Sequence, residues 1–243
     1  MKQKKVVIAW LYPDLMSTYG DRGNIIVLTK RCQWRKIPVE VKQITLETPV
    51  SVLRSCNLIF MGGAQDRQQK IAGDDFRLNK GPVIKKMIEG GTPALFVCAA
   101  YQFVGQYYKP YQGEPIPGAG IWDLFTVHPG DQAKRCIGNT MAEVINPAEL
   151  AGTVIVGFEN HGGRSHLGPK MKPLGKVLKG YGNNGEDGFE GAVYKNSIGC
   201  YYHGPFLPKN PVFADWLISK VVGKLSPLDD SLEKKANEAV RSL

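Results

Sequence analysis

The sequence has no Cys-x-x-Cys pair, and its five cysteines are an odd number. This usage argues against a zinc ribbon and against a full disulfide framework, because both need paired cysteines. Long apolar runs are also missing, since none approaches the roughly 20 residues that cross a bilayer. No N-terminal stretch has the pattern of a signal peptide. We therefore expect a soluble protein of the reducing cytoplasm with no transmembrane segment.

Motifs for nucleotides and metals are equally scarce. There is no Gly-x-x-x-x-Gly-Lys-Ser/Thr loop, and Gly118-x-Gly120 does not extend to a dinucleotide fingerprint. Acidic residues do not gather as a Mg²⁺ site needs. His161 and His166 stand five positions apart in a glycine-rich turn, which is poor spacing for a helical zinc pair. We therefore expect neither a metal nor a cofactor in this chain.

The charge is unbalanced but dispersed. Lys and Arg number 31 against 22 Asp and Glu, which gives a net charge of +9. Such an excess can favour nucleic acid or an anionic membrane surface. However, the basic residues occur in pairs such as Lys85-Lys86 and Lys234-Lys235, and aromatic residues do not interleave with them as in a single-strand binder. We therefore expect no nucleic-acid partner.

The N-terminal half alternates apolar strands with amphipathic helices. Apolar runs predict buried strands, and apolar residues at helical spacing predict helices. The predicted strands are 5–12, 39–45, 56–61 and 94–97, and the predicted helices are 25–36 and 75–89. This rhythm indicates an α/β fold, a mostly parallel sheet with helices on both faces. The 243 residues suffice for one large domain with a buried core.

The C-terminal half has a different texture. Residues 107–120 are rich in Tyr, Pro and Gly, which predicts an ordered surface loop. Further strands are predicted at 140–145, 153–158, 191–194 and 197–202, and helices at 212–224 and 232–243. We therefore divide the chain into a domain over residues 1–225 and a C-terminal helical tail over residues 226–243.

One cysteine lies where a nucleophile would be expected. The buried strand 94–97 leads into Cys98, and the small residues Ala99 and Ala100 allow a sharp turn into a short helix. The positive end of that helix favours a thiolate. The arrangement is the cysteine form of a nucleophile elbow. The alternative is a small buried hydrophobe, the role of most intracellular cysteines.

A thiol nucleophile needs a base, which is normally a histidine distant in the sequence. Of the four histidines, only His203 follows a predicted buried strand, so it would project from the same sheet edge as Cys98. We therefore pair these two residues; the alternative is a histidine that only satisfies a hydrogen bond at a strand end. The backbone N–H of Ala99 and an N–H of Gly63 or Ala64 are suitable donors for an oxyanion hole.

Several short motifs are spread along the chain. They are Tyr19-Gly20-Asp21-Arg22-Gly23-Asn24, Gly62-Gly63-Ala64-Gln65-Asp66-Arg67, Cys98 to Gly105, Gly157 to Arg164, Gly180 to Asp187 and His203 to Pro211. Taken together, these motifs resemble those of the class I glutamine amidotransferases. The resemblance is to the cobyric-acid-synthase-like branch, and within it to the glutaminase subunits of lipid II isoglutaminyl synthases. It implies the three-layer, flavodoxin-like fold of that family.

The resemblance implies that Cys98 attacks the side-chain amide of L-glutamine and that His203 moves the proton. Ammonia leaves, a γ-glutamyl thioester remains, and water then releases glutamate. A family arginine that binds substrate maps onto Arg135, where it would hydrogen-bond the glutamine carboxylate. Without the resemblance, Arg135 would be interpreted as a solvated loop arginine.

The sequence departs from the family pattern at three places. Ala99 and Ala100 replace two glycines at the elbow, and Ala64 replaces the third glycine of a Gly-Gly-Gly motif. The elbow methyl groups should fit if both residues keep ordinary backbone angles. Pro205 stands where many class I enzymes have a glutamate that orients the histidine. We therefore expect a Cys-His dyad, or a triad whose acid comes from elsewhere. The unranked candidates for that acid are Glu159, Asp187 and Glu190.

Ammonia is protonated in neutral water and loses its nucleophilicity, so it must reach its acceptor by a shielded route. Activating a carboxylate acceptor needs ATP, for which this chain has no motif, so a separate ATP-using partner is expected. The resemblance implies a MurT-like ligase subunit that holds ATP and Mg²⁺ and amidates the α-carboxyl of D-glutamate in lipid II, at the inner face of the membrane. Two alternatives stay open. One is a glutaminase for another synthetase, such as a corrinoid one, and the other is an inactive interaction protein of the same fold.

Overall fold

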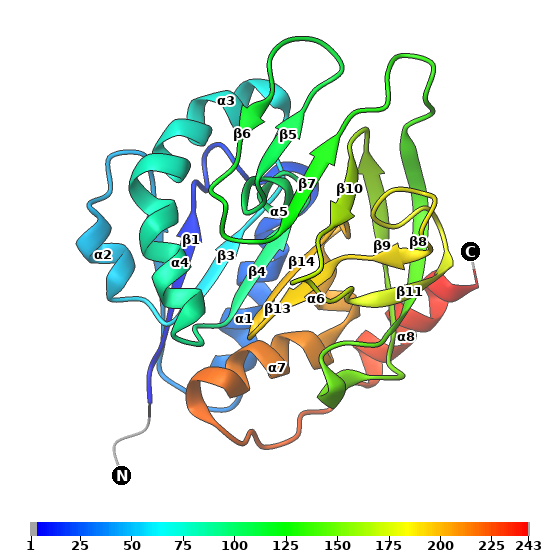
Figure 1. Cartoon of the computed structure of the whole chain (residues 1–243). Helices are drawn as coiled ribbons and strands as arrows, with labels where there is room; N and C mark the ends of the chain where they lie inside the picture. The colour runs from blue at the N-terminus through cyan, green and yellow to red at the C-terminus, as the bar shows by residue number, and fades with distance from the viewer. Residues whose placement is uncertain (1–3, 243) are drawn as a thin grey trace.

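The computed structural model describes residues 4–242, apart from the side chains of Tyr19 and Asp66. The first three residues of the predicted domain and the last residue of the predicted tail therefore lie outside the described residues. The centre is a six-stranded sheet with the order β13-β14-β4-β3-β1-β2 (Figure 1). Its strands are β1 (Val6–Leu11), β2 (Val39–Ile44), β3 (Leu58–Met61), β4 (Ala94–Val97), β13 (Ala192–Tyr194) and β14 (Ser197–Cys200).

The pairing in this sheet is mostly parallel, as predicted. All neighbouring strands run parallel except β13, which is antiparallel to β14 at one edge. Every residue of β3, β4 and β14 is buried, which is typical of strands covered on both faces. In β2, at the other edge, most residues are only half-buried. Burial of the apolar runs therefore decides which strands occupy the middle of the sheet.

Helices cover both faces of the sheet, which confirms the predicted fold class (Figure 1). One face carries α1 (Arg22–Trp34) and α7 (Pro211–Val222), which contact each other. The other carries α2 (Val50–Arg54), α3 (Asp66–Asp75) and α4 (Gly81–Glu89). Helix, sheet and helix form the three layers.

The segment between β3 and β4 differs from its prediction. The sequence predicts one helix over 75–89, but the structure has α3, a π-helical turn (Phe76–Lys80) and then α4. Pro82 lies in the first turn of α4 and has no N–H for the hydrogen-bond ladder. A proline at this position starts an α-helical segment well, so the change from the π-helical turn to α4 falls just before it.

Two smaller four-stranded sheets are formed by the chain between β4 and β13 of the central sheet, with the orders β10-β7-β5-β6 and β12-β11-β8-β9. Residues 107–120, predicted as a loop, contain the antiparallel pair β5 and β6. These strands have three and two residues, too few to leave a sequence pattern. The strands are β5 (Tyr107–Lys109), β6 (Ile116–Pro117), β7 (Leu124–Val127), β8 (Cys136–Val144), β9 (Val154–His161), β10 (Arg164–Leu167), β11 (Gly175–Lys179) and β12 (Phe189–Glu190).

The C-terminal helix α8 (Ser231–Arg241) lies in the region predicted as the tail. A buried guanidinium ties the chain just before it to the domain. Arg31 in α1 is 1% exposed, and its Nε lies 2.6 Å from Asp215 Oδ1 in α7, while its Nη1 lies 2.7 Å from Asp230 Oδ1. One side chain thus joins α1, α7 and the start of α8.

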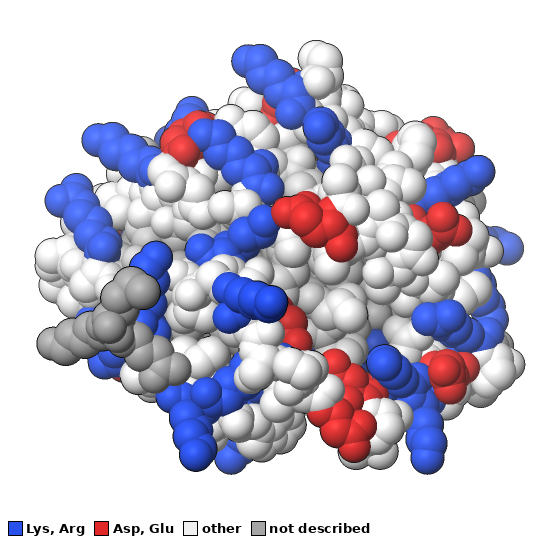
Figure 2. All heavy atoms as spheres, turned by 90° about the horizontal axis from the view of Figure 1, so that it is seen from below, with Lys and Arg blue, Asp and Glu red and all other residues white. Residues whose placement is uncertain are grey.

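The surface carries its charge in small groups. Figure 2 shows Lys and Arg side chains spread over the lower face, with Asp and Glu side chains among them. On this face the basic residues do not merge into one stripe, in line with the dispersed pattern of the sequence. Within residues 4–242, no helix combines the length and the apolar character needed to cross a bilayer.

The carboxyl ends of four parallel strands meet at one edge of the central sheet. The chain leaves β1, β3, β4 and β14 there, and the loops that follow carry Asp21, Gly63, Cys98 and His203. Ligands of open α/β sheets bind outside this edge. The sheet topology therefore brings four candidate site residues, which are far apart in the sequence, to one edge.

Candidate active site

Cys98 lies at the sharp turn between β4 and α5 (Ala99–Phe103). Its φ of 55° and ψ of −108° cost about 1–3 kcal/mol for a residue with a Cβ. Two backbone hydrogen bonds hold this conformation: the Cys98 N–H donates to the Cys200 carbonyl, N to O 2.8 Å, and the Cys98 carbonyl accepts from the Gln102 N–H, N to O 3.1 Å. The side chain is 9% exposed and lines a cavity. The fold thus holds a thiol in a fixed place at the cavity wall.

The two alanines after the nucleophile candidate fit the elbow. Ala99 and Ala100 are fully buried and begin α5, and neither has a positive φ. Their methyl groups therefore need no unusual backbone angle. As the first helical residue, Ala99 has an N–H without an acceptor inside the helix. That N–H is next to the thiol, where a donor to an oxyanion would be useful.

His203 follows β14 and is held by β9 through its backbone. The His203 N–H donates to the Phe158 carbonyl, N to O 2.8 Å, and the Phe158 N–H donates back, N to O 3.2 Å. The ring is 1% exposed, its Nδ1 hydrogen-bonds Asp21, and the Cys98 side chain lies beside it. Burial opposes a charge on the ring, but the negative charges of Cys98 and Asp21 and the hydrogen bonding around the ring raise the pKa of His203 to about 10. The structure therefore brings together the two residues that the sequence paired.

An acid that was not among the sequence candidates reaches the same imidazole. Asp21 is fully buried, and its Oδ1 lies 3.2 Å from His203 Nδ1. It follows the 3-10 turn η1 (Thr18–Gly20) and directly precedes α1. A signal was present in the sequence, because Asp21 belongs to the loop after the first strand and so comes to the same sheet edge as Cys98 and His203.

The three acids considered from the sequence have other partners. Glu159 accepts two backbone N–H groups from the loop after β11. Asp187 accepts from the side-chain amide of Asn184, and Glu190 accepts the backbone N–H of Tyr201, N to O 2.7 Å. The acid that the structure shows against His203 is thus Asp21.

Gly63 packs against the side chains of Cys98, His203 and Asp21. A Cβ on Gly63 would lie 2.8 Å from His203 Cε1, 3.3 Å from Cys98 Cβ and 3.3 Å from Asp21 Oδ2, so only glycine fits without a shift. The Gly63 N–H donates to Asp21 Oδ2, N to O 2.6 Å. In this structure that amide is therefore directed at the carboxylate. The place of Gly63 in an oxyanion hole stays a prediction.

Ala64 follows Gly63 and lines the same cavity as Cys98. Its carbonyl accepts from Gln69 Nε2, N to O 3.1 Å, and Gln69 is 4% exposed. This contact fixes the peptide after Gly63 from the α3 side. Ala64 thus lies on the loop after β3, and Ala99 directly follows Cys98 at the start of α5.

The cavity at Cys98 measures about 650 Å³, and Arg135 also lines it. Arg135 Nε donates to Asn160 Oδ1, N to O 2.6 Å, and Nη2 donates to the Asn160 carbonyl, N to O 3.3 Å. A guanidinium held on one edge keeps donors on its other edge, and such donors suit a carboxylate. The structure therefore places Arg135 and Cys98 in one cavity, as the site prediction needs.

Two glycines shape the cavity opposite Cys98. A Cβ on Gly162 would lie 2.8 Å from His128 Nε2, and one on Gly163 would lie 2.9 Å from Gln102 Nε2. Their small size lets His128 and Gln102 approach the turn and line the cavity. Neither lining residue was chosen from the sequence, because a lone loop histidine and a helical glutamine give no distinct pattern.

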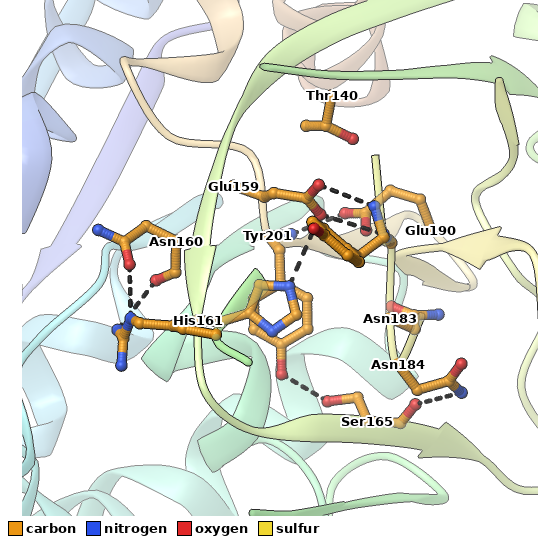
Figure 3. Close-up of polar contacts among 12 residues, drawn as sticks. Thr140, Glu159, Asn160, His161, Ser165, Asn183, Asn184, Glu190 and Tyr201 are labelled. Atoms are coloured by element: carbon orange, nitrogen blue, oxygen red, sulfur yellow. Dashed lines mark hydrogen bonds and ion pairs between the residues drawn. The ribbon is translucent and has the colours of Figure 1, made fainter. Parts of the chain in front are cut away.

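A buried polar cluster adjoins the cavity at His161 (Figure 3). The ring of His161 stacks on Tyr201, whose hydroxyl meets Ser165 Oγ at 2.7 Å and accepts from Gln102 Nε2 at 3.1 Å. Burial lowers the pKa of His161. Burial also raises the pKa of Glu190 to about 8, with the nearby carboxylates adding to the shift. Both groups are therefore favoured in their neutral forms near pH 7.

Metal ligation finds little support in the described part of the chain. Among residues 4–242, no three His, Cys, Asp or Glu side chains are grouped so that they could hold a metal ion. The arrangement at Cys98 instead contains a thiol, a histidine, an acid and an arginine at a cavity. Together these groups can perform nucleophilic attack on a carbonyl and bind an anionic end of the same molecule.

Comparison with known proteins places the chain in a family. Residues 7–211 match the model of the CobB/CobQ-like glutamine amidotransferase domain. The chain is 42% identical over 207 residues to the GatD subunit of a glutamine-hydrolysing lipid II isoglutaminyl synthase from Staphylococcus aureus, and the match covers 85% of this chain and 80% of that protein. To the corresponding GatD subunit from Streptococcus pneumoniae it is 36% identical over 217 residues, covering 89% and 80%.

A solved structure of PurLQS from Thermotoga maritima is also similar, with a TM-score of 0.62 at 16% identity. The match covers 90% of this chain and 97% of that one. A likeness at this identity concerns the fold alone.

Proposed function

The chain belongs to the CobB/CobQ-like glutamine amidotransferase family, and we propose from that membership that it hydrolyses L-glutamine through Cys98 and passes ammonia to an ATP-dependent ligase subunit that amidates lipid II. One observation carries the proposal. Cys98 and Arg135 line the same cavity, and the His203 ring lies beside Cys98. The cavity thus has a place for the amide end and a place for the carboxylate end of one glutamine.

The first half of the reaction forms a thioester. The Cys98 sulfur attacks the carbonyl carbon of the glutamine side chain, and the C=O bond opens to an oxyanion, which the N–H groups of Ala99 and Ala64 stabilise. As the C–N bond breaks, the His203 imidazolium gives its proton to the leaving nitrogen. Ammonia departs as NH₃, and a γ-glutamyl thioester remains on Cys98. The raised pKa of His203 supports an imidazolium beside a thiolate at the start of this step.

The second half restores the enzyme. Water attacks the thioester carbonyl, and neutral His203 takes a proton from it. The tetrahedral intermediate then collapses, the C–S bond breaks, and glutamate and the Cys98 thiolate separate. The charges are then those of the starting state, an imidazolium beside a thiolate.

Arg135 orients the substrate from the other end of the cavity. Its guanidinium makes charge-assisted hydrogen bonds to the α-carboxylate of glutamine, while Asn160 keeps the side chain in place. Arg135 thus contributes to binding of glutamine in the orientation that places the side-chain amide at Cys98.

In this proposal, a partner subunit binds the molecule that accepts the ammonia. The two relatives above are named as subunits of lipid II isoglutaminyl synthases, and we take the partner to be a MurT-like ligase that binds ATP and Mg²⁺. It would activate the α-carboxyl of D-glutamate in lipid II, so that NH₃ displaces phosphate and forms the amide. ATP and Mg²⁺ then act in the partner, at the inner face of the membrane in the cytoplasm.

A corrinoid-amidating synthetase is the second candidate acceptor, because the family model also covers cobyric-acid-type proteins. The lipid II acceptor is favoured, since both GatD relatives match more than four-fifths of this chain, at 85% and 89%.

Glutamate release by three forms of the chain tests the proposal. Wild type, Cys98→Ser and Cys56→Ser are each assayed with L-glutamine, alone and together with the MurT-like subunit, ATP and lipid II. Cys56 is a matched control, because its thiol donates to the Val52 carbonyl, S to O 3.5 Å, and a serine can make the same contact. We expect Cys98→Ser to lose activity by about 10³-fold or more and Cys56→Ser to retain it.

Glutamine labelled with ¹⁵N in its side-chain amide identifies the acceptor in the same mixtures. Label in the isoglutamine of lipid II supports the proposal, and label in a corrinoid amide instead supports the second candidate. If wild type releases no glutamate in any mixture, the chain is an inactive interaction protein of this fold.

A further inference from the structure

We propose that Asp21 is a positioning residue that orients His203 and the Gly63 loop around the Cys98 thiol, an inference that rests on the proposed function. Asp21 is fully buried between the end of η1 and the start of α1. No sequence spacing links it to His203, since 182 positions separate them. The carboxylate is instead brought to the imidazole by the parallel sheet, which places the loops after β1 and β14 at one edge.

The two carboxylate oxygens have different partners. Oδ1 faces His203 Nδ1 at 3.2 Å, and Oδ2 accepts the Gly63 N–H at 2.6 Å. Because an ionised carboxylate only accepts hydrogen bonds, Nδ1 must carry the proton. Nε2 is then the atom left to exchange a proton with the thiol and the substrate. Asp21 thereby selects the tautomer of His203 that the proposed mechanism needs.

The surrounding loop is built around this carboxylate. A Cβ on Gly62 would lie 2.9 Å from Asp21 Oδ2, and one on Gly63 would lie 3.3 Å from it. Both glycines are therefore needed for the close approach of the loop to Asp21. Since Oδ2 holds the Gly63 amide, the carboxylate also fixes the peptide that carries Ala64, a residue of the cavity wall. One side chain sets the positions of the proton carrier and of a predicted oxyanion donor.

The charges near Asp21 fit this assignment. The titratable side chain in contact with it is His203, and the charges of Cys98 and Asp21 act on that ring together. The thiols of Cys98 and of Cys200, at the end of β14, are further titratable groups near it, and Cys200 lies in the buried strand. Removing the Asp21 charge therefore weakens the imidazolium that partners the Cys98 thiolate.

The decisive variant is Asp21→Asn, in the chain assembled with its ligase subunit. An asparagine can keep an oxygen for the Gly63 N–H while its amide group faces Nδ1, and this arrangement selects the wrong tautomer of His203. We expect kcat for glutamate release to fall by about 30-fold or more, with KM for glutamine changed by less than about threefold. Glu190→Gln is the matched control, because it makes the same chemical change at another fully buried carboxyl. It should keep kcat within about threefold of wild type.

The pH dependence of Cys98 alkylation by iodoacetamide tests the role of Asp21 in a second way. It should change only if Asp21 acts on the His203 ring, and not if Asp21 only stabilises the fold. In Asp21→Asn the pH of half-maximal alkylation should rise by about one unit, because the imidazolium that stabilises the thiolate is weakened. Glu190→Gln should leave this pH unchanged. If Asp21→Asn folds, keeps the wild-type alkylation profile and loses less than about threefold in kcat, Asp21 is not a positioning residue.

A measurement on the wild-type chain covers the case in which Asp21→Asn does not fold. With ¹⁵N-labelled histidine, the Nδ1 signal of His203, assigned by its loss in His203→Gln, should be that of a protonated nitrogen from pH 6 to 8. An unprotonated Nδ1 in this range overturns the proposal. Failure of the proposed function looks different: wild type would then release no glutamate, whereas the alkylation and ¹⁵N results would still report on Asp21.

Discussion

The imidazole of His161 lies flat against the phenol ring of Tyr201, with 3.6 Å between the ring centroids and 10° between the planes. His161 Nδ1 is 2.8 Å from the Gly163 carbonyl oxygen, an acceptor that requires the proton on Nδ1. Because burial lowers the pKa of His161, its ring is neutral near pH 7. His203, by contrast, has a raised pKa. Two histidines near one thiol therefore differ in their protonation state.

This difference predicts unequal effects of removing the two rings. His161→Phe keeps an aromatic ring against Tyr201, so we expect kcat for glutamate release to fall by less than about tenfold. His203→Phe removes the proposed proton carrier and should lower kcat by about 10²–10⁴-fold. Steady-state assays at saturating glutamine give both values. Equal losses in the two variants would show that His161 also moves a proton.

Gly63→Ala tests the crowding around the thiol. The added Cβ would lie 2.8 Å from His203 Cε1, so the ring or the loop must shift. A shift near 1 Å at a reacting group costs about 10²-fold in rate, and we expect a loss in kcat of at least this size. Gly73→Ala is the matched control, because its Cβ meets only Phe103 at 3.7 Å and lies in α3. If the two variants were equally active, Gly63 would not be crowded as the structure shows.

Arg135→Gln tests the binding of the substrate carboxylate. A hydrogen bond to a charged group contributes about 1.5–3 kcal/mol, so KM for glutamine should rise by about 10–150-fold while kcat changes little. Arg77→Gln removes the same charge at an exposed ion pair with Asp74 and should leave KM unchanged. A substrate without the α-carboxylate should be hydrolysed equally by wild type and Arg135→Gln. A loss confined to kcat would contradict the assigned role.

The fold could be predicted from the sequence because its strands are apolar runs. In β3 and β4 every residue is buried, and such runs leave little choice of structure. Cys98 follows β4 and His203 follows β14, which are both buried apolar runs, so the sequence alone pairs the two residues. Parallel strands in one sheet bring their carboxyl ends to one edge, so distant residues could be placed together without knowledge of their contacts.

The missed features depend on contacts that leave no local pattern. Asp21 follows a 3-10 turn. Its place after the first strand brings it to the same sheet edge as His203, but no spacing or periodicity marks it as the partner of that ring. The hairpin of β5 and β6 is formed by pairing across a turn, and its strands are shorter than any pattern that could reveal them. The sequence could have predicted the change of helix type before Pro82, because proline removes a helical N–H.

Glu190 predicts an unusual dependence of stability on pH. Burial raises its folded-state pKa from 4.5 to about 8, so the native state holds a proton that the unfolded state has lost. The native state binds more protons between these two values, and the free energy of unfolding therefore falls as pH rises from about 4.5 to about 8. Below this pH range Glu190 is protonated in both states and does not lower the free energy of unfolding. Above it Glu190 is ionised in both states, and the loss of stability no longer changes with pH.

Glu190→Gln removes this titration and keeps an oxygen for the Tyr201 N–H, which Glu190 Oε1 accepts at 2.7 Å. We expect the variant and wild type to differ little at pH 5, and the variant to be more stable by on the order of 4 kcal/mol at pH 8. Urea unfolding at pH 5, 6.5 and 8 measures the difference, with Glu143→Gln, an exposed residue of β8, as the control. A difference that stays constant across the three pH values would mean that Glu190 is ionised in the native state near neutral pH.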